Sequence, residues 1–181
     1  MRVGAGFFAG DVLDVAPALL GKILVRKLDG AELRLRITET EAYRGEEDTA
    51  CHAHRGKTPR AEVLYRAPGT LYLYLCYGVH WMLNLVTGAE GTPQATLIRA
   101  GEGVAGPGRL TKYLCLDKRY NGLSVDSLRD FWIEDDGARP AYRAAARVGI
   151  GYADEADREK LWRYTALPET GEAPPRGTKG S

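Results

Sequence analysis

Two adjacent hydrophobic runs constrain the fold of this chain more than any other feature. Residues 70–77 and 80–86 have the composition of β-strands, and Gly78 lies between them as a hairpin tip. Successive side chains of a strand point to opposite faces, so the leucines of the first run share one face while Tyr72 and Tyr74 share the other. The pattern predicts a hairpin with one face in the core and one face rich in tyrosine.

The rest of the sequence predicts short strands and short helices around this hairpin. Further strands are expected at residues 22–28, 32–43, 94–100, 130–134 and 146–150, with a type I′ turn at Asp29-Gly30. Helices are expected at residues 14–20, 58–66, 108–116 and 155–164, the first capped by Asp14 and the last by Asp154. Antiparallel hairpins with intervening helices predict the α+β class, a single mixed domain with helices flanking one sheet.

The composition is typical of one globular domain. The 181 residues are 44% hydrophobic and 27% charged, which is enough apolar material for a core. We expect the domain to span residues 1–167, and the polar residues 168–181, rich in Pro and Gly, to form a disordered tail. The net charge of +1 indicates no partner, although basic residues gather within residues 99–119 and 139–147.

Cysteine usage and hydropathy indicate a cellular compartment. Cys51, Cys76 and Cys115 are odd in number and widely spaced, and the first residues lack the basic and apolar regions of a signal peptide. We therefore expect free thiols in a reducing, cytoplasmic setting. No apolar run approaches the length of a membrane span, so we expect no membrane partner, and we expect a monomer.

Residues 31–43 (AELRLRITETEAY) contain the first candidate site. Ile37, Glu39, Glu41 and Tyr43 share one parity, so the apolar face of this strand is expected to run directly into two glutamates and a tyrosine. A glutamate at the rim of a cleft is partly desolvated, which raises its pKa and makes it a usable general base. The alternative is a strand end that frays into solvent, with both carboxylates hydrated.

The histidine-containing segment at residues 51–60 (CHAHRGKTPR) raises the question of a metal site. Cys51, His52 and His54 could act as ligands, but only His80 remains as a further histidine and no second pair has metal spacing. We therefore expect no metal and no other cofactor. His52 is interpreted as a neutral hydrogen-bonding residue of a pocket, or as a plain loop residue.

Basic side chains lie in two segments that suit phosphate. Arg55 and Lys57 follow the histidines, as a phosphate-facing loop requires, although a solvated charged loop has the same pattern. Residues 106–108 (GPG) open a predicted helix with Arg109 and Lys112 close by. That arrangement suits a phosphate at the helix start and a structural cap equally well.

The apex of the predicted hairpin carries Tyr77 next to Gly78, where no other part of the hairpin covers it. An aromatic residue at such an apex can act as a wedge that fills the space left by an extruded base. Core packing explains any one tyrosine of the hairpin as well. The tyrosine-rich face is therefore either a packed ribbon or a platform for a flat ligand such as a nucleobase.

Five segments follow one another along residues 39–153: ETEAYRGEEDTACHAHRGKTPR, APGTLYLYLCYGVHWMLNLV, TLIRA, GPGRL and RVGIGYA. Together they resemble the alkyladenine (3-methyladenine) DNA glycosylase family, the single-domain type that is distinct from helix-hairpin-helix glycosylases. The resemblance extends over about residues 15–165. It implies a mixed domain around a curved antiparallel sheet that acts on double-stranded DNA containing damaged purines, associated with the nucleoid if the source is bacterial.

The resemblance also implies a reaction. Enzymes of this family hydrolyse the N-glycosidic bond of a flipped, alkylated or deaminated purine and leave an abasic site in base excision repair. Glu41 is similar to the base that activates water, Arg99 to its partner in holding that water, and the backbone carbonyl of Val148 to the third contact. No lysine matches a nucleophile position in these motifs, so we expect a monofunctional enzyme; a general acid is not identified.

The remaining implied residues form the binding pocket and the DNA contact. Tyr43, His52 and Tyr74 resemble the walls that sandwich the flipped base. Asn84 resembles the residue that crowds the 2-amino group of guanine and so disfavours that normal base. Tyr77 resembles the residue that enters the duplex.

Two other functions are compatible with the same residues. A non-catalytic nucleic-acid-binding module could use the aromatic hairpin, and it would bind DNA without releasing a base. A carbohydrate-active hydrolase could use Glu39 and Glu41, although two carboxylates on one strand face seldom flank a sugar from opposite sides.

Overall fold

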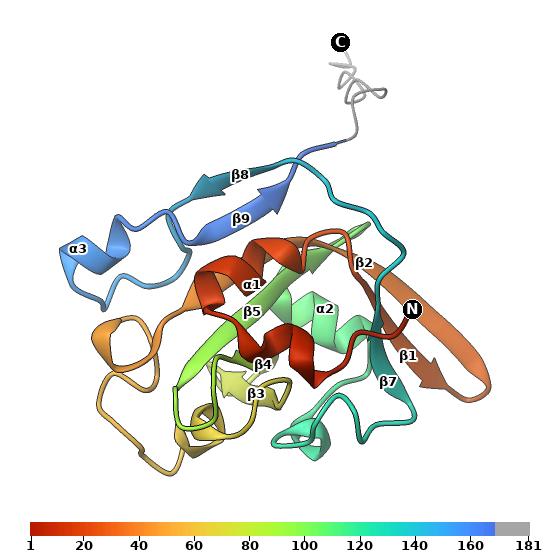
Figure 1. The fold of residues 1–181 in the computed structure, drawn as a ribbon, viewed down its shortest axis with the longest axis horizontal. Helices are drawn as coiled ribbons and strands as arrows, with labels where there is room; N and C mark the ends of the chain where they lie inside the picture. The colour runs from red at the N-terminus through yellow and green to blue at the C-terminus, as the bar shows by residue number, and fades with distance from the viewer. Residues whose placement is uncertain (169–181) are drawn as a thin grey trace.

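Every strand pair within residues 1–168, the part of the chain that the computed structural model describes, is antiparallel, and the strands form one curled sheet (Figure 1). The strands are β1 (Ile23–Leu28), β2 (Ala31–Tyr43), β3 (Leu71–Cys76), β4 (His80–Thr87), β5 (Gln94–Gly101), β6 (Val104–Ala105), β7 (Phe131–Glu134), β8 (Tyr142–Ala145) and β9 (Arg163–Ala166). The α-helices are α1 (Val12–Ala18), α2 (Pro107–Tyr113) and α3 (Glu155–Arg158). Four short 3₁₀ helices are η1 (Ala5–Ala9), η2 (Gly45–Glu47), η3 (Glu62–Tyr65) and η4 (Lys118–Tyr120). The predicted α+β class, with a single domain around a curved antiparallel sheet, is confirmed.

Strand β2 is the longest strand and changes partners along its length. The main path of the sheet is β3-β4-β5-β2-β1-β7. β1 pairs with β2 from Ala31 to Arg36, and β9 pairs with β2 from Glu39 to Glu41. β5 pairs with this second half of β2 along its other edge. The end of β2 is therefore enclosed between β5 and β9 instead of forming a free sheet edge.

Two hairpin tips of the sheet each contain a pair of residues with positive φ angles. Asp29 (φ 50°) and Gly30 (φ 85°) form the turn between β1 and β2, as a type I′ turn requires. Tyr77 (φ 51°) and Gly78 (φ 69°) form the corresponding tip between β3 and β4. A positive φ is uncommon for a tyrosine, and here it accompanies a side chain that is 91% exposed.

The main core lies on one face of the central strands, where α1 and α2 pack. Leu71 and Leu73 are buried in this core together with side chains of both helices. Tyr72 and Tyr74 belong to a second cluster, which the loop at residues 44–70 completes. That loop is drawn in orange to yellow at the left of Figure 1. The alternation predicted for the hairpin is confirmed.

The first helix begins two residues earlier than the sequence predicts. α1 starts at Val12, and the carboxylate of Asp11 caps it by accepting the Leu13 N–H at 2.9 Å. The same carboxylate forms an ion pair with Arg44 at 2.8 Å, which ties the helix to the end of β2. The prediction of Asp14 as the cap is wrong because two aspartates precede apolar residues here, and the tertiary contact selects the earlier one.

Three further predicted elements differ from the structure. The helix expected at residues 58–66 is reduced to η3, and the buried Ala61 just before it and Leu64 within it are three residues apart, the period of a 3₁₀ turn. The strand expected at residues 146–150 is absent, and β8 precedes it. The helix expected at residues 155–164 is limited to α3, because the chain after it extends to pair with β2 as β9.

The C-terminal region contains one more difference. Asp154 precedes α3 as predicted, but its side chain makes no capping hydrogen bond. The predicted tail lies outside the described residues, apart from Pro168. Within residues 1–168, no helix has the length and hydrophobicity that crossing a membrane requires.

Candidate active site

An irregularity in the second half of β2 reverses which side chains face the main core. Glu41 consequently lies on the opposite face of the strand. The ladder between β2 and β5 shifts register between Ile37 and Glu39 and again between Glu39 and Thr40, as at a β-bulge. Beyond the shift, the Thr40 hydroxyl donates to a carbonyl of α1 at 2.8 Å and Ala42 lies in the main core. The prediction of one uninterrupted face from Ile37 to Glu41 is therefore wrong, because counting alternate residues cannot detect a bulge.

The Glu41 side chain is fully buried and is held by three groups. The Val148 N–H donates to its Oε1 at 2.8 Å, and the Tyr43 hydroxyl donates to its Oε2 at 2.9 Å. Arg99 Nη1 lies 3.5 Å from Oε1. A frayed and hydrated strand end is therefore excluded for this carboxylate.

Burial raises the pKa of Glu41 above its usual value, because an ionised carboxylate loses its water on burial. The Arg99 guanidinium, the Val148 N–H and the Tyr43 hydroxyl act in the opposite direction, since each stabilises the charged form. The effect of burial is larger. A carboxylate with a raised pKa accepts a proton closer to neutral pH, which is the property that a general base needs.

Arg99 connects the two glutamates of β2. Its Nε lies 3.6 Å from Glu39 Oε1, while its Nη1 approaches Glu41. Glu39 also forms an ion pair with Arg163 at 2.9 Å. Two arginines therefore neutralise Glu39, so it is a poor second catalytic carboxylate, and the arrangement does not favour a carbohydrate-active hydrolase.

A pocket lies between the end of β2, the β3–β4 hairpin and the loop at residues 50–52. Its lining consists of Tyr43, Ala50, Cys51, His52, Leu64, Tyr72, Tyr74, Asn84, Ala95 and Tyr152. The structure thus brings together all four residues that the sequence predicts as substrate-binding. The cavity measures about 30 Å³, room for about one or two water molecules.

His52 forms part of the pocket wall with two tyrosines of β3. Its Nδ1 lies 2.8 Å from the Tyr72 hydroxyl, and its ring meets the Tyr74 ring edge-on at 4.5 Å between centroids. Burial, with a smaller contribution from the positive charge of Arg60, lowers the pKa of His52 to about 4. The imidazole is therefore neutral near pH 7, and it does not repel a cationic ligand.

Asn84 is buried in the same pocket and held in place by the backbone. Its side-chain amide donates to the Tyr72 carbonyl at 3.2 Å and to the Met82 carbonyl at 3.3 Å. These two bonds limit its rotation.

The two histidines of residues 51–60 have separate partners. His54 Nδ1 lies 3.0 Å from the Glu46 carbonyl, on the exposed side of the loop, whereas His52 lines the pocket. Within residues 1–168, no three His, Cys, Asp or Glu side chains are grouped so that they could hold a metal ion. Of these two histidines, His52 forms part of the pocket wall and His54 does not.

Comparison with known proteins decides the family. A family model described as Methylpurine-DNA glycosylase (MPG) matches residues 6–106 and 104–169. The chain belongs to this family. A protein of Psychrobacter cryohalolentis named "Putative 3-methyladenine DNA glycosylase" is 44% identical to the chain, over 90% of each. Proteins of the same name from Desulfitobacterium hafniense and Methanocella arvoryzae are each 40% identical, over 90% and 87% of this chain and 94% and 88% of their own lengths. The predicted family and the predicted class of enzyme, a hydrolase of N-glycosidic bonds, are confirmed.

Tyr77 of the glycosylase lies at the hairpin tip and does not line the pocket. It is 91% exposed and its neighbour Val79 is 69% exposed. Both side chains are therefore exposed to solvent at the tip of the β3–β4 hairpin.

The four basic residues predicted to contact DNA are exposed: Arg55, Lys57, Arg109 and Lys112. The last two lie on α2, which packs against the start of β4 through a hydrogen bond from the Thr111 hydroxyl to the Trp81 carbonyl at 2.8 Å. Arg109 and Lys112 therefore lie beside the β3–β4 hairpin, whose tip contains Tyr77.

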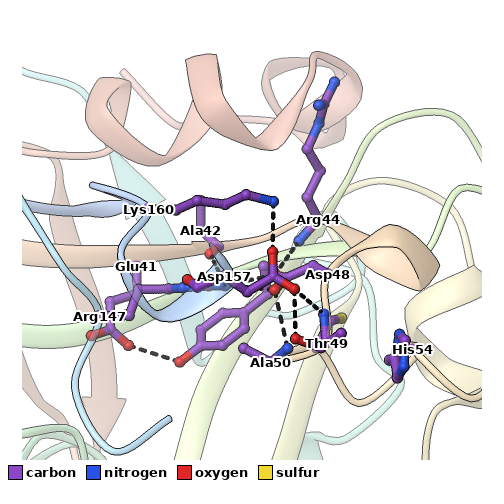
Figure 2. Close-up of polar contacts among 12 residues, drawn as sticks. Glu41, Ala42, Arg44, Asp48, Thr49, Ala50, His54, Arg147, Asp157 and Lys160 are labelled. Atoms are coloured by element: carbon purple, nitrogen blue, oxygen red, sulfur yellow. Dashed lines mark hydrogen bonds and ion pairs between the residues drawn. The ribbon is translucent and has the colours of Figure 1, made fainter. Parts of the chain in front are cut away.

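A buried ion pair between Arg147 and Asp48 supports this site, and the sequence analysis missed it (Figure 2). Two N–H groups of Arg147 donate to the two carboxylate oxygens of Asp48 at 2.6 and 2.8 Å. Arg147 also donates to the Ala42 carbonyl at 2.9 Å, and its guanidinium carbon lies 4.8 Å from the centre of the Tyr43 ring. The pair thus fixes the segment that carries Val148 against the end of β2. The only signal in the sequence is that both residues lie within the motifs of the family.

Proposed function

We propose that this glycosylase removes alkylated purines such as 3-methyladenine, and deaminated purines, from duplex DNA, by flipping the base and hydrolysing its N-glycosidic bond with a water molecule that Glu41 activates. The proposal rests on one observation: a buried carboxylate of raised pKa adjoins a pocket walled by Tyr43, His52 and Tyr74. The names of the relatives, which refer to 3-methyladenine, support an alkylated purine as the substrate class.

The aromatic walls favour a damaged base over a normal one. Stacking on an aromatic side chain stabilises an extruded base by about 1–3 kcal/mol, which offsets much of the few kcal/mol that flipping costs. A purine such as 3-methyladenine is cationic, so the rings of Tyr43 and Tyr74 add a cation–π attraction. His52 is neutral near pH 7 and does not oppose this attraction. A normal purine pairs more firmly and carries no such charge.

Asn84 excludes normal guanine in this proposal. The side chain lines the pocket, and two hydrogen bonds to backbone carbonyls limit its movement. The restricted side chain crowds the position of an exocyclic 2-amino group, so a purine that carries this group fits the pocket less well than one that lacks it.

Glu41 acts in two ways during hydrolysis. As a carboxylate, it stabilises the positive charge that develops on the sugar and takes a proton from the attacking water. Arg99 and the Val148 carbonyl hold that water; Arg99 lies 3.5 Å from Glu41, and the N–H of Val148 is bonded to the same carboxylate. The glycosidic bond of a cationic purine is already weakened, so the departing base needs little help from an acid.

The enzyme leaves an abasic site without cutting the strand. Among the described residues, the pocket lining contains no lysine that could attack the sugar as an amine nucleophile. Tyr77 enters the duplex from the hairpin tip and fills the space of the extruded nucleotide. The exposed cations on α2 and on the loop after His52 contact phosphates on either side.

Glu41→Gln tests the chemistry. The isosteric amide keeps the volume of the side chain but cannot accept a proton, so base release from methylated duplex DNA should fall at least about 100-fold. Binding to the same DNA should persist. Glu62→Gln, at an exposed position on η3, is the matched control and should release the base at the wild-type rate.

Three outcomes would contradict the proposal. Wild-type rates in the Glu41→Gln variant would remove Glu41 from the reaction. A wild-type protein that binds methylated DNA and releases no methylpurine would be a non-catalytic binding module instead. A borohydride-trapped covalent adduct between the protein and DNA would contradict monofunctional hydrolysis.

A further inference from the structure

The segment after Val148 folds back onto the loop that carries His52. Ile150 and Ala153 pack against Ala50, and Tyr43 borders the same small cluster. This packing brings the residue between them, Tyr152, to the pocket, although it lies far from the other aromatic residues of the pocket in the sequence.

Tyr152 is anchored at its polar end and open along its ring. Its hydroxyl donates to the Ala50 carbonyl at 2.8 Å. The residue is nevertheless 67% exposed, and it lines the pocket together with Tyr43 and Tyr74. A tyrosine that serves only to hold a segment in place buries its ring, as Tyr120 does at 6% exposure in the main core with its hydroxyl bonded to Asp130.

We infer that Tyr152 is a further substrate-contacting residue, whose ring provides an additional aromatic surface for the extruded purine at the pocket mouth. The inference rests on the proposed function, since it requires a flipped purine in this pocket. Every base has a π-face, so an aromatic ring at the mouth interacts with a purine whatever its substituents. The hydroxyl anchor restricts the ring before the base arrives, so little side-chain freedom is lost when contact forms.

Three substitutions at this position separate the ring from its anchor. Tyr152→Phe keeps the ring and removes the hydrogen bond to Ala50. Tyr152→Leu keeps apolar bulk without an aromatic face, and Tyr152→Ala removes both. Because the side chain is mostly exposed, all three variants should fold, and a thermal melt of each checks this. Tyr142→Ala is the matched control, since Tyr142 is 47% exposed and does not line the pocket.

Two measurements on each variant test the inference. The first is kcat/KM for release of 3-methyladenine from duplex DNA methylated with dimethyl sulfate. We expect it to fall roughly tenfold for Tyr152→Ala and Tyr152→Leu, within the range of one base–aromatic contact. It should stay within about twofold of wild type for Tyr142→Ala. Tyr152→Phe keeps the ring but loses the anchor, so its kcat/KM should fall less than that of Tyr152→Ala. The second is the Kd for a duplex with a tetrahydrofuran abasic analogue, which has no base to stack and should bind all variants equally.

The outcomes separate this inference from the proposed function. If wild type releases no methylpurine, the proposed function fails. If wild type is active and Tyr152→Ala has the same kcat/KM, only the role of Tyr152 fails. It also fails if Tyr152→Phe loses as much as Tyr152→Ala, since the anchor and not the ring would then matter. An equal loss of affinity for the abasic duplex would place the contact on the DNA outside the pocket.

Discussion

Replacement of Asp48 by Asn should destabilise the glycosylase far more than loss of an ordinary charge. Asp48 accepts four hydrogen bonds: two from Arg147, at 2.6 and 2.8 Å, one from the Arg44 N–H at 3.0 Å and one from the Ala50 N–H at 3.1 Å. The side chains of Asp48 and Arg147 are both 0% exposed. An Asn side chain has only one acceptor oxygen and no charge, so Arg147 remains buried without its counter-ion.

The magnitude follows from that burial. Breaking a buried ion pair by removal of one partner costs about 3–5 kcal/mol, because the remaining charge is neither hydrated nor paired. Domains of this size have unfolding free energies of about 5–15 kcal/mol, so the loss is a large fraction of the total. The melting temperature should fall by about 6–20 °C, at about 2–4 °C per kcal/mol.

Urea unfolding followed by tryptophan fluorescence measures this loss. The matched control is Glu62→Gln, which removes an exposed ion pair with Arg66 at 3.6 Å and should change the unfolding free energy by less than about 1 kcal/mol. Asp48→Asn combined with Arg147→Met should recover part of the stability, because no unpaired charge remains. A loss below about 1 kcal/mol for Asp48→Asn alone would refute the reasoning and mean that Arg147 reaches solvent.

Two further predictions concern the reaction and the DNA contact. Tyr43→Phe removes a hydrogen bond that lowers the pKa of Glu41, so this pKa should rise and more Glu41 should be protonated at a given pH. Because the base must be ionised to act, the acid limb of the kcat/KM–pH profile should move to higher pH. An unmoved limb would mean that Glu41 is not the titrating base. Tyr77→Ala removes a side chain that is 91% exposed, so the unfolding free energy should change by less than about 0.5 kcal/mol. Its affinity for a lesion duplex, measured by fluorescence anisotropy, should fall about tenfold, and equal affinity would remove the wedge role.

The hairpins are the part of the fold that could be predicted from neighbouring residues. The alternation in β3 places Leu71 and Leu73 in the core and Tyr72 on the pocket side, as predicted. Asp29-Gly30 forms its turn because both positions adopt positive φ, which Asp and Gly tolerate. The α-helix predicted at residues 58–66 is wrong, since this segment forms only the 3₁₀ turn η3, and Ala61 and Leu64, three residues apart, pack into the cluster beside the pocket.

The candidate site could be predicted only in part. The motifs of the family identify Glu41 and the pocket residues, and the structure brings them together. Asp48 and Arg147 carry no local signal of pairing, since they are 99 positions apart. Tyr152 was missed for the same reason: its relation to the pocket depends on packing between Ala50 and the segment after Val148.

The sequence by itself determined the strand periods, the tight turns and the residue types available for catalysis, because these depend on side chains within a few positions of one another. Only the tertiary structure decided that Glu41 is a buried carboxylate of raised pKa. A bulge changes the face of its strand, β9 encloses that strand, and the Val148 N–H comes from 107 positions away. Desolvation depends on every atom that surrounds a group, and those atoms are assembled from distant parts of the chain only when it folds.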